Sequence, residues 1–188
     1  AEETLAASLP YRDRILGVGL DSDERGNPPE KFAAVFAAAK QAGYRLTMHC
    51  DIDQEQSIAN IATVLHQIGV ERIDHGTNIL EDDALVAEAK ERGIGFTCCP
   101  LSNSFVTEQM KGQEITDLLR QGLKVSVASD DPAYFGGYVG DNLAALAIAQ
   151  ELSREEIVQL ARNSLEISWA DPQRVDAWVA QLEEIAAR

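Results

Sequence analysis

Five short apolar runs recur along the chain at intervals of roughly 25 to 30 residues, and longer amphipathic segments separate them. Each run is rich in β-branched or aromatic residues and ends in small or polar residues. The runs are Ile15–Leu20, Arg45–His49, Arg72–His75, Gly95–Cys99 and Lys124–Ala128. Strands that alternate with helices at this spacing are typical of βαβ units. The sequence therefore predicts an α/β fold with parallel strands.

The segments between these runs have the periodicity of helices. In one of them the apolar residues Phe32, Val35, Phe36 and Ala39 follow an i, i+3, i+4, i+7 spacing. Several helices are followed by a glycine, which is favoured just past a helix because it adopts the left-handed conformation readily. The predicted helices are Pro29–Ala42, Gln56–Ile68, Asp82–Arg92, Gly112–Gln121, Asn142–Leu152, Arg154–Ile167 and Asp171–Ala187, and the glycines are Gly43, Gly69, Gly93 and Gly122.

Two architectures accommodate such strands: an open doubly wound sheet, or a piece of a TIM (β/α)8 barrel. An open sheet usually concentrates its binding residues near one switch point, whereas here polar residues follow every predicted strand. The barrel is favoured because the carboxyl ends of all its strands face one pocket. A complete barrel has about 250 residues, so we expect this 188-residue chain to be the C-terminal portion, with about five βα units and the first strands upstream. We expect residues 1–188 to form a single domain.

Composition narrows the possible partners. The formal net charge of −15 argues against nucleic acid, because no basic stripe is available to displace counterions from a phosphate backbone. No apolar run approaches the length that spans a bilayer, and the first residues have no signal-peptide pattern. Three cysteines without C-x-x-C spacing predict neither a disulfide framework nor a thiolate metal site. A cytoplasmic protein without membrane partners is expected.

Histidines and acids at the strand ends are the candidates for chemistry. His49 and His75 end consecutive predicted strands, and Asp130 and Asp131 follow the last one, whereas His66 lies within a predicted helix. Adjacent carboxylates at a buried strand end repel each other unless a cation or a donor separates their roles. Imidazole and carboxylate are ligands that catalytic zinc prefers. The pattern therefore suggests a divalent metal held partly by His49 and Asp130, with one position open for water.

Residues 17–142 resemble the adenosine/adenine deaminase family of the amidohydrolase superfamily. The stretches that carry the resemblance are GVGLDSDERGNPPEKF, TMHC, RIDHG, CPLSN and SDDPAYFGGY, in the order of the family. Their detailed form is more similar to the adenine deaminase branch than to the nucleoside-specific enzymes. Within CPLSN, Ser102 and Asn103 are expected either to support the site or to cap a turn.

The resemblance implies a zinc-dependent aminohydrolase and gives roles to particular residues. His49 matches the third metal histidine, and Asp130 matches the metal aspartate. His75 matches the histidine that orients and helps to deprotonate the attacking water. Asp131 matches the carboxyl that binds the purine ring at N7, and Ser22 falls where the family contacts the N3 edge. The implied reaction is hydrolysis of the 6-amino group of adenine to give hypoxanthine.

The chain departs from the family pattern in two places. The H-x-H pair of the first barrel strand does not occur, so two metal ligands are missing and the chain alone is expected to be inactive. The family follows its third metal histidine with x-G-E, whose glutamate protonates N1 of the purine, but here Ile52 aligns with that glutamate. We expect Asp51 or Asp53 to replace it, and the shorter side chain would leave room for an N6-substituted adenine such as a cytokinin base.

Three hypotheses about the function follow from these observations. The first is a purine-base deaminase of which this chain is the C-terminal portion. The second is an adenosine deaminase, or another hydrolase of the same superfamily that acts on a different C–N bond. The third is a fragment without independent catalysis that pairs with a complementary N-terminal barrel half or with itself, since an exposed barrel edge tends to associate.

Overall fold

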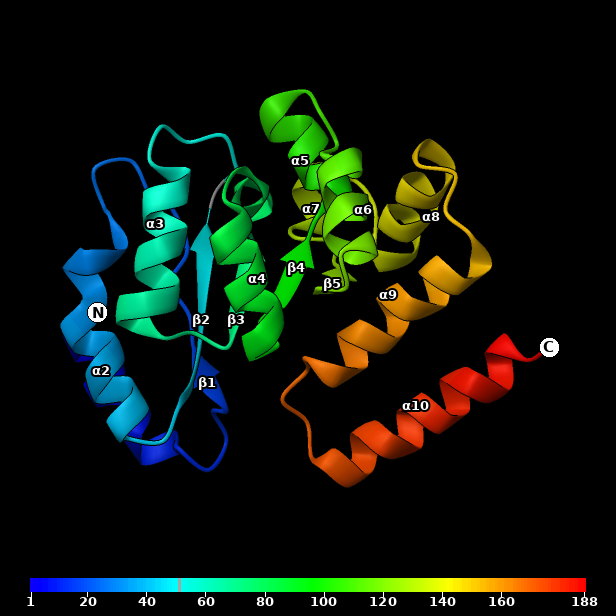
Figure 1. Ribbon diagram of the computed structural model, residues 1–188. Helices are drawn as coiled ribbons and strands as arrows, with labels where there is room; N and C mark the ends of the chain where they lie inside the picture. Colours follow the sequence, from blue (N-terminus) through cyan, green and yellow to red (C-terminus); the bar gives the residue numbers. More distant parts are fainter. Residues whose placement is uncertain (51) are drawn as a thin grey trace. The chain divides into compact units, whose positions relative to one another are not determined.

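The computed structural model describes residues 1–50 and 52–188. These residues form two compact units, residues 1–94 and residues 95–188, and each unit is described by itself (Figure 1). In both units strands alternate with helices, and the strands that pair within a unit run parallel. The predicted α/β class with about five βα units is confirmed. The prediction that residues 1–188 form a single domain stays a prediction.

The first unit contains three parallel strands with β2 between β1 and β3. Helix α2 and helix α3 both contact β2, and α2 also contacts the turn that continues α3. The elements are α1 (Glu2–Ser8), η1 (Leu9–Tyr11), β1 (Gly17–Val18), η2 (Pro29–Phe32), α2 (Ala33–Gln41), β2 (Arg45–Cys50), α3 (Ser57–Thr63), η3 (Val64–Ile68), β3 (Arg72–His75), η4 (Thr77–Glu81) and α4 (Asp83–Arg92).

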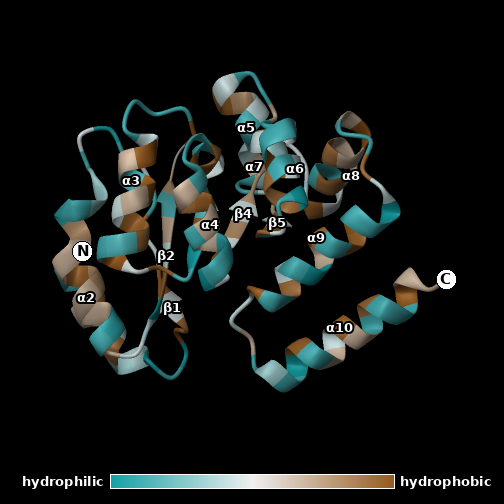
Figure 2. Cartoon of the chain, in the orientation of Figure 1, coloured by the Kyte–Doolittle hydropathy of each residue, from teal (hydrophilic) through white to brown (hydrophobic). Residues whose placement is uncertain are grey.

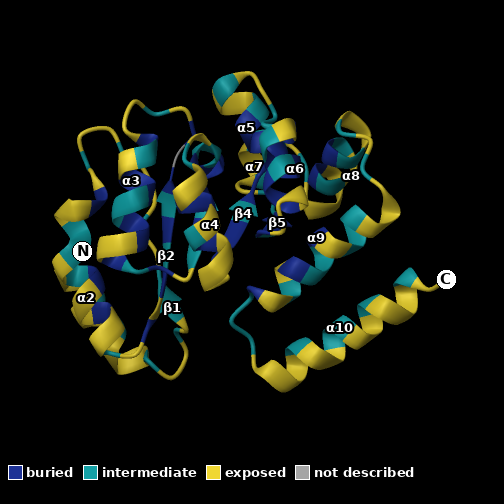
Figure 3. Ribbon diagram, viewed as in Figure 1, coloured by how far each residue is buried: buried dark blue, intermediate teal, exposed yellow. Residues whose placement is uncertain are grey.

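Buried and partly buried side chains alternate along β2. Leu46, Met48 and Cys50 are buried, whereas Thr47 and His49 on the other face are only partly buried. This follows from the two-residue period of a strand, which sends successive side chains to opposite faces. The buried residues line the strands and the inner sides of the helices (Figure 3).

The second unit pairs β4 with β5 in parallel, in register from Gly95 opposite Lys124 to Cys98 opposite Val127. Helices α6, α8 and α9 contact β5, and α10 packs on α9 without burying any residue of its own (Figure 3). The elements are β4 (Gly95–Cys98), α5 (Pro100–Thr107), α6 (Gly112–Arg120), β5 (Lys124–Val127), α7 (Pro132–Phe135), α8 (Val139–Ala149), α9 (Arg154–Glu166) and α10 (Pro172–Ala186).

In the second unit the strands consist mostly of apolar residues, and apolar and polar residues alternate along the helices (Figure 2). Phe96 and Val125, on β4 and β5, are fully buried together with Leu118 of α6 and Leu160 of α9. Asn163 of α9 is buried too, and its Nδ2 donates to the backbone oxygen of Val125 at 2.7 Å. That bond satisfies a strand carbonyl that would otherwise lose its contact with water.

Most predicted boundaries lie within a few residues of the observed ones, although the first strand, predicted over Ile15–Leu20, is only two residues long. The glycines predicted to end helices all have positive φ: Gly43 83°, Gly69 72°, Gly93 66° and Gly122 84°. Three helices were not predicted: α1, α5 and α7. Within the described ranges no helix has both the length and the apolar composition to cross a membrane.

Candidate active site

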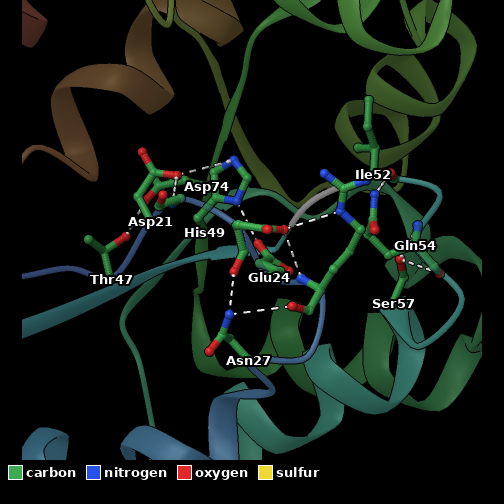
Figure 4. Close-up of polar contacts among 12 residues, drawn as sticks. Asp21, Glu24, Asn27, Thr47, His49, Ile52, Gln54, Ser57 and Asp74 are labelled. Atoms are coloured by element: carbon green, nitrogen blue, oxygen red, sulfur yellow. Dashed lines mark hydrogen bonds and ion pairs between the residues drawn. The ribbon is translucent and has the colours of Figure 1, made fainter.

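His49 lies on the partly buried face of β2, and two acidic residues of the loop that follows β1 contact its ring. Its Nδ1 lies 2.5 Å from Oε1 of Glu24, and its Nε2 lies 3.7 Å from Oδ1 of Asp21 (Figure 4). The side chains of His49 and Glu24 are 18% and 16% exposed, so water has little access to their contact. The backbone N–H of His49 also donates to the oxygen of Leu20 at 2.9 Å, which fixes the start of this loop on β2.

His75 is the last residue of β3 and lies directly beside His49. The two imidazole ring centroids are 4.6 Å apart, and the ring planes meet at 78°. His75 is buried and has a φ of 59°, and Gly76 follows it with a φ of 70°. A left-handed conformation is uncommon for a residue other than glycine, and it turns the chain sharply at the end of the strand. The two histidines that the sequence singled out are therefore brought together.

Next to these histidines, polar side chains of the same two strands, β2 and β3, contact each other. Thr47 donates from Oγ1 to Oδ2 of Asp74 at 2.7 Å, and Asp74 stands opposite His49 in the register of β2 and β3. Cys50 lies on the opposite, buried face of β2. Burial, and then the negative charges of Glu24 and Asp74, raise the pKa of the Cys50 thiol well above its usual range. A thiol that keeps its proton is a poor metal ligand.

Asp130 follows β5 in the second unit and adopts a left-handed conformation with a φ of 55°. Its Oδ2 accepts a hydrogen bond of 2.6 Å from Oγ of Ser102, which is buried at the start of α5. Asp131 is exposed and precedes the first turn of α7 as its N-cap residue. One buried hydroxyl thus orients the carboxylate that the sequence proposed as a metal ligand.

The structure describes only one of the two acids proposed as proton donors. Asp51 lies outside the described residues. Asp53 is exposed, with a φ of 56°, and its backbone N–H donates to Oδ1 of Asn78 at 2.9 Å while Asn78 Nδ2 lies 3.3 Å from Oδ1 of Asp53. Ile52, which aligns with the family's glutamate, is buried. Asp53 is thus held toward the turn after β3 by a reciprocal pair.

A cavity of about 260 Å³ opens beside His49 in the first unit. Leu20, Phe32 and Met48 give it apolar walls, and polar groups at its edge include Ser22 and Asn27. Ser22 is exposed, with a φ of 99°. Small-molecule sites commonly combine mostly apolar walls with a few placed polar groups. The lining also includes Asp21, Asp23 and Glu24, so the cavity combines apolar walls with hydrogen-bonding and acidic groups.

The sequence analysis did not select Glu24, whose carboxylate lies 2.5 Å from the ring of His49. A signal for it was present, because Glu24 belongs to the polar cluster directly after the first predicted strand, where Ser22 was selected. The position of its carboxyl depends on the path of the loop, which no local pattern specified.

Parallel strands with imidazoles and carboxylates at their carboxyl ends are characteristic of α/β enzymes that bind substrate at that end. The chain belongs to the adenosine deaminase family, whose profile matches residues 1–185. It is 47% identical over its whole length to an uncharacterized deaminase of Schizosaccharomyces pombe, of which it covers 56%. It is 43% identical over 189 aligned positions to an adenine deaminase of Marinomonas sp., covering 100% of this chain and 56% of that protein.

Solved structures agree with this assignment. The crystal structure of an adenine deaminase from Arthrobacter aurescens matches with a TM-score of 0.91 and 36% identity, over 100% of this chain and 57% of that one. A zinc-bound amidohydrolase from Burkholderia ambifaria matches with a TM-score of 0.86 and 26% identity, over 98% of this chain and 52% of that one. The chain thus spans little more than half the length of these relatives.

Proposed function

We propose that the complete protein containing this chain deaminates a 6-aminopurine base by hydrolysis. Adenine and water give hypoxanthine and ammonia, and an N6-substituted adenine gives hypoxanthine and the corresponding amine. The observation that carries the proposal is the contact of His49 with His75 at the strand ends, beside a cavity with apolar walls and polar edges. The similarity to adenine deaminases supports the choice of substrate class.

One divalent metal, proposed to be zinc, completes the site. The donor set fits it, since His49 offers an imidazole and Asp130 a carboxylate that Ser102 orients. Two further ligands are proposed to come from the H-x-H pair of the family, which this chain does not contain. The ion, when bound, supplies a nucleophile at neutral pH by acidifying water.

The remaining residues bind the base and move protons. His75 accepts the proton of the attacking water as the water approaches C6. Asp131 binds the ring at N7, and Ser22, which lines the cavity, contacts the N3 edge. A carboxyl at Asp51 or Asp53 protonates N1, which removes ring aromaticity and makes C6 electrophilic. General acid–base assistance of this kind contributes about 10²–10⁴ in rate.

An aspartate at either of these positions is shorter than the glutamate of the family pattern. The room that it leaves is the basis for proposing N6-substituted adenines, including cytokinin-like bases, as substrates beside adenine. The proposed partners are these small molecules together with a complementary N-terminal barrel half, or a second copy of the chain, against the exposed barrel edge.

Ammonia release from adenine, adenosine and N6-alkyl adenines by the zinc-loaded complete protein tests the proposal. We expect release of ammonia or amine from the free bases, with hypoxanthine as the purine product. The variant His75→Gln should be slower by about 10²–10⁴. The matched variant His66→Gln should keep wild-type activity, because His66 pairs with Glu88 on the exposed surface.

Two results would contradict the proposal. Hydrolysis of amides or lactones without any action on purines would favour a different hydrolase of the superfamily. Stoichiometric zinc on the 188-residue chain alone would contradict the claim that two ligands come from outside it.

A further inference from the structure

Two histidines of the first unit contact carboxylates through opposite ring nitrogens. Nδ1 of His49 lies 2.5 Å from Oε1 of Glu24, whereas Nε2 of His66 lies 2.7 Å from Oε2 of Glu88. A neutral imidazole has one N–H donor and one acceptor nitrogen, and an ionised carboxylate only accepts. The carboxylate therefore selects which nitrogen of each ring carries the proton.

We propose that Glu24 is a positioning residue that holds neutral His49 as the Nδ1–H tautomer. The lone pair of the ring then resides on Nε2, the nitrogen that points away from Glu24. That Nε2 of His49 binds a metal rests on the function proposed above, but the tautomer itself does not. A ligating histidine commonly donates its second ring N–H to a carboxylate, which fixes the ring orientation and raises the basicity of the ligand.

The surroundings of the pair favour this arrangement. The side chains of His49 and Glu24 are 18% and 16% exposed, whereas those of His66 and Glu88 are 56% and 31% exposed. Water competes less for the partly buried contact between His49 and Glu24. Its hydrogen bond therefore fixes the position of the ring proton more strongly than the contact between His66 and Glu88 does. The carboxylate of Asp21 lies farther from the ring, 3.7 Å from Nε2, so the contact of Glu24 with Nδ1 is the shorter of the two.

Hydrogen bonds to backbone oxygens hold the loop that carries Glu24. The hydrogen bond from the N–H of His49 to the oxygen of Leu20 fixes the loop four residues before Glu24 on the same strand that carries the imidazole. Asn27 then donates to the oxygen of Asp23 at 3.0 Å and closes the loop directly behind Glu24. The pair is thus built into the chain itself and requires no ligand to form.

Nitrogen-15 NMR of histidine-labelled protein tests the inference directly. At about pH 8.5, above the usual imidazole range of about 6.5, we expect the Nδ1–H tautomer for His49 and the Nε2–H tautomer for His66. The variant Glu24→Ala should shift His49 toward the Nε2–H form, and Glu24→Gln should retain Nδ1–H because its amide oxygen still accepts. The matched control Glu88→Ala should alter only the signals of His66.

Zinc affinity of the complete protein gives a second measurement. Glu24→Ala should lose about 10–100-fold in affinity, and Glu24→Gln should recover part of that loss. Nε2–H on wild-type His49, or a tautomer that Glu24→Ala leaves unchanged, would overturn the inference even if adenine is deaminated. Nδ1–H in a protein that releases no ammonia from purines would uphold the tautomer and reject only the proposed function. The wild-type spectrum decides the inference even if Glu24→Ala fails to fold.

Discussion

The variant Ser102→Ala tests whether Ser102 positions Asp130, the second proposed metal ligand, or only supports the fold. The substitution removes the donor that lies 2.6 Å from Oδ2 of Asp130 and changes little else, because the Ser102 side chain is small and buried. A hydrogen bond to a charged group contributes about 1.5–3 kcal/mol. Asp130 is exposed, however, so water replaces most of that bond in the free protein. We therefore expect the free energy of unfolding to fall by only about 1 kcal/mol or less.

Metal affinity should respond more strongly than stability. Loss of a partner that orients a ligand commonly lowers metal affinity by about 10–100-fold, which corresponds to about 1.4–2.8 kcal/mol. The assay is competition for zinc with a chromophoric chelator, measured on the complete protein together with urea unfolding. Ser104→Ala is the matched control, because Ser104 lies in the same helix and donates to the backbone oxygen of Pro100 instead.

Two outcomes would refute this reasoning. Wild-type zinc affinity in a folded Ser102→Ala protein would mean that Ser102 does not position a ligand. A loss of several kcal/mol in unfolding free energy, with Ser104→Ala unchanged, would mean that Ser102 supports the fold rather than the site.

Two further predictions concern the second unit. The pKa of Glu156 lies below its ordinary value, because Arg120 donates a hydrogen bond to its side chain and the N-cap backbone N–H of α9 donates another. This stabilisation is present above the unfolded carboxyl pKa of about 4.3 and is lost as pH falls through the lower folded value. Urea unfolding of wild type and Glu156→Gln should then differ by less than about 1 kcal/mol at pH 6 and converge once the pH has fallen below the folded pKa of Glu156. A difference that grows toward acid would contradict the assignment. Asn163→Leu leaves the buried carbonyl of Val125 without its donor and should cost about 1–3 kcal/mol in unfolding free energy. Ser164→Ala is the control, because Ser164 is exposed on the same helix and donates to the backbone oxygen of Ala161. It should stay within about 0.5 kcal/mol, and equal losses in the two variants would argue against the Val125 bond as the cause.

The positions of β2 to β5 could be predicted from the sequence because each of these strands is an apolar run of almost the observed length, as with Arg72–His75. Helix ends could be predicted where a glycine takes up positive φ, as at Gly93. Helix α5 was missed because CPLSN reads as the polar end of a strand. Its signal was Pro100 at the first helical position, where the missing N–H costs nothing.

The site was only partly predictable. His49 and His75 lie at the ends of neighbouring parallel strands, which predicts that they lie near each other. In the register, however, His75 stands opposite Cys50, so the ring contact also depends on the left-handed conformation of His75. The approach of Glu24 depends on a loop that includes Ser22 at a φ of 99° and Gly26 at 72°, and such backbone angles have no unique sequence signal. The pairing of Asp53 with a side chain 25 residues further along the chain could not be foreseen either, since it depends on how the two turns pack.

The most direct test of the account is a crystal structure of the complete protein with zinc, using anomalous scattering to locate the metal. We predict one zinc ion within about 2.0–2.2 Å of both Nε2 of His49 and a carboxylate oxygen of Asp130, with His75 adjacent to the remaining coordination position. Zinc bound elsewhere, or His49 and Asp130 too far apart to share one ion, would contradict the account.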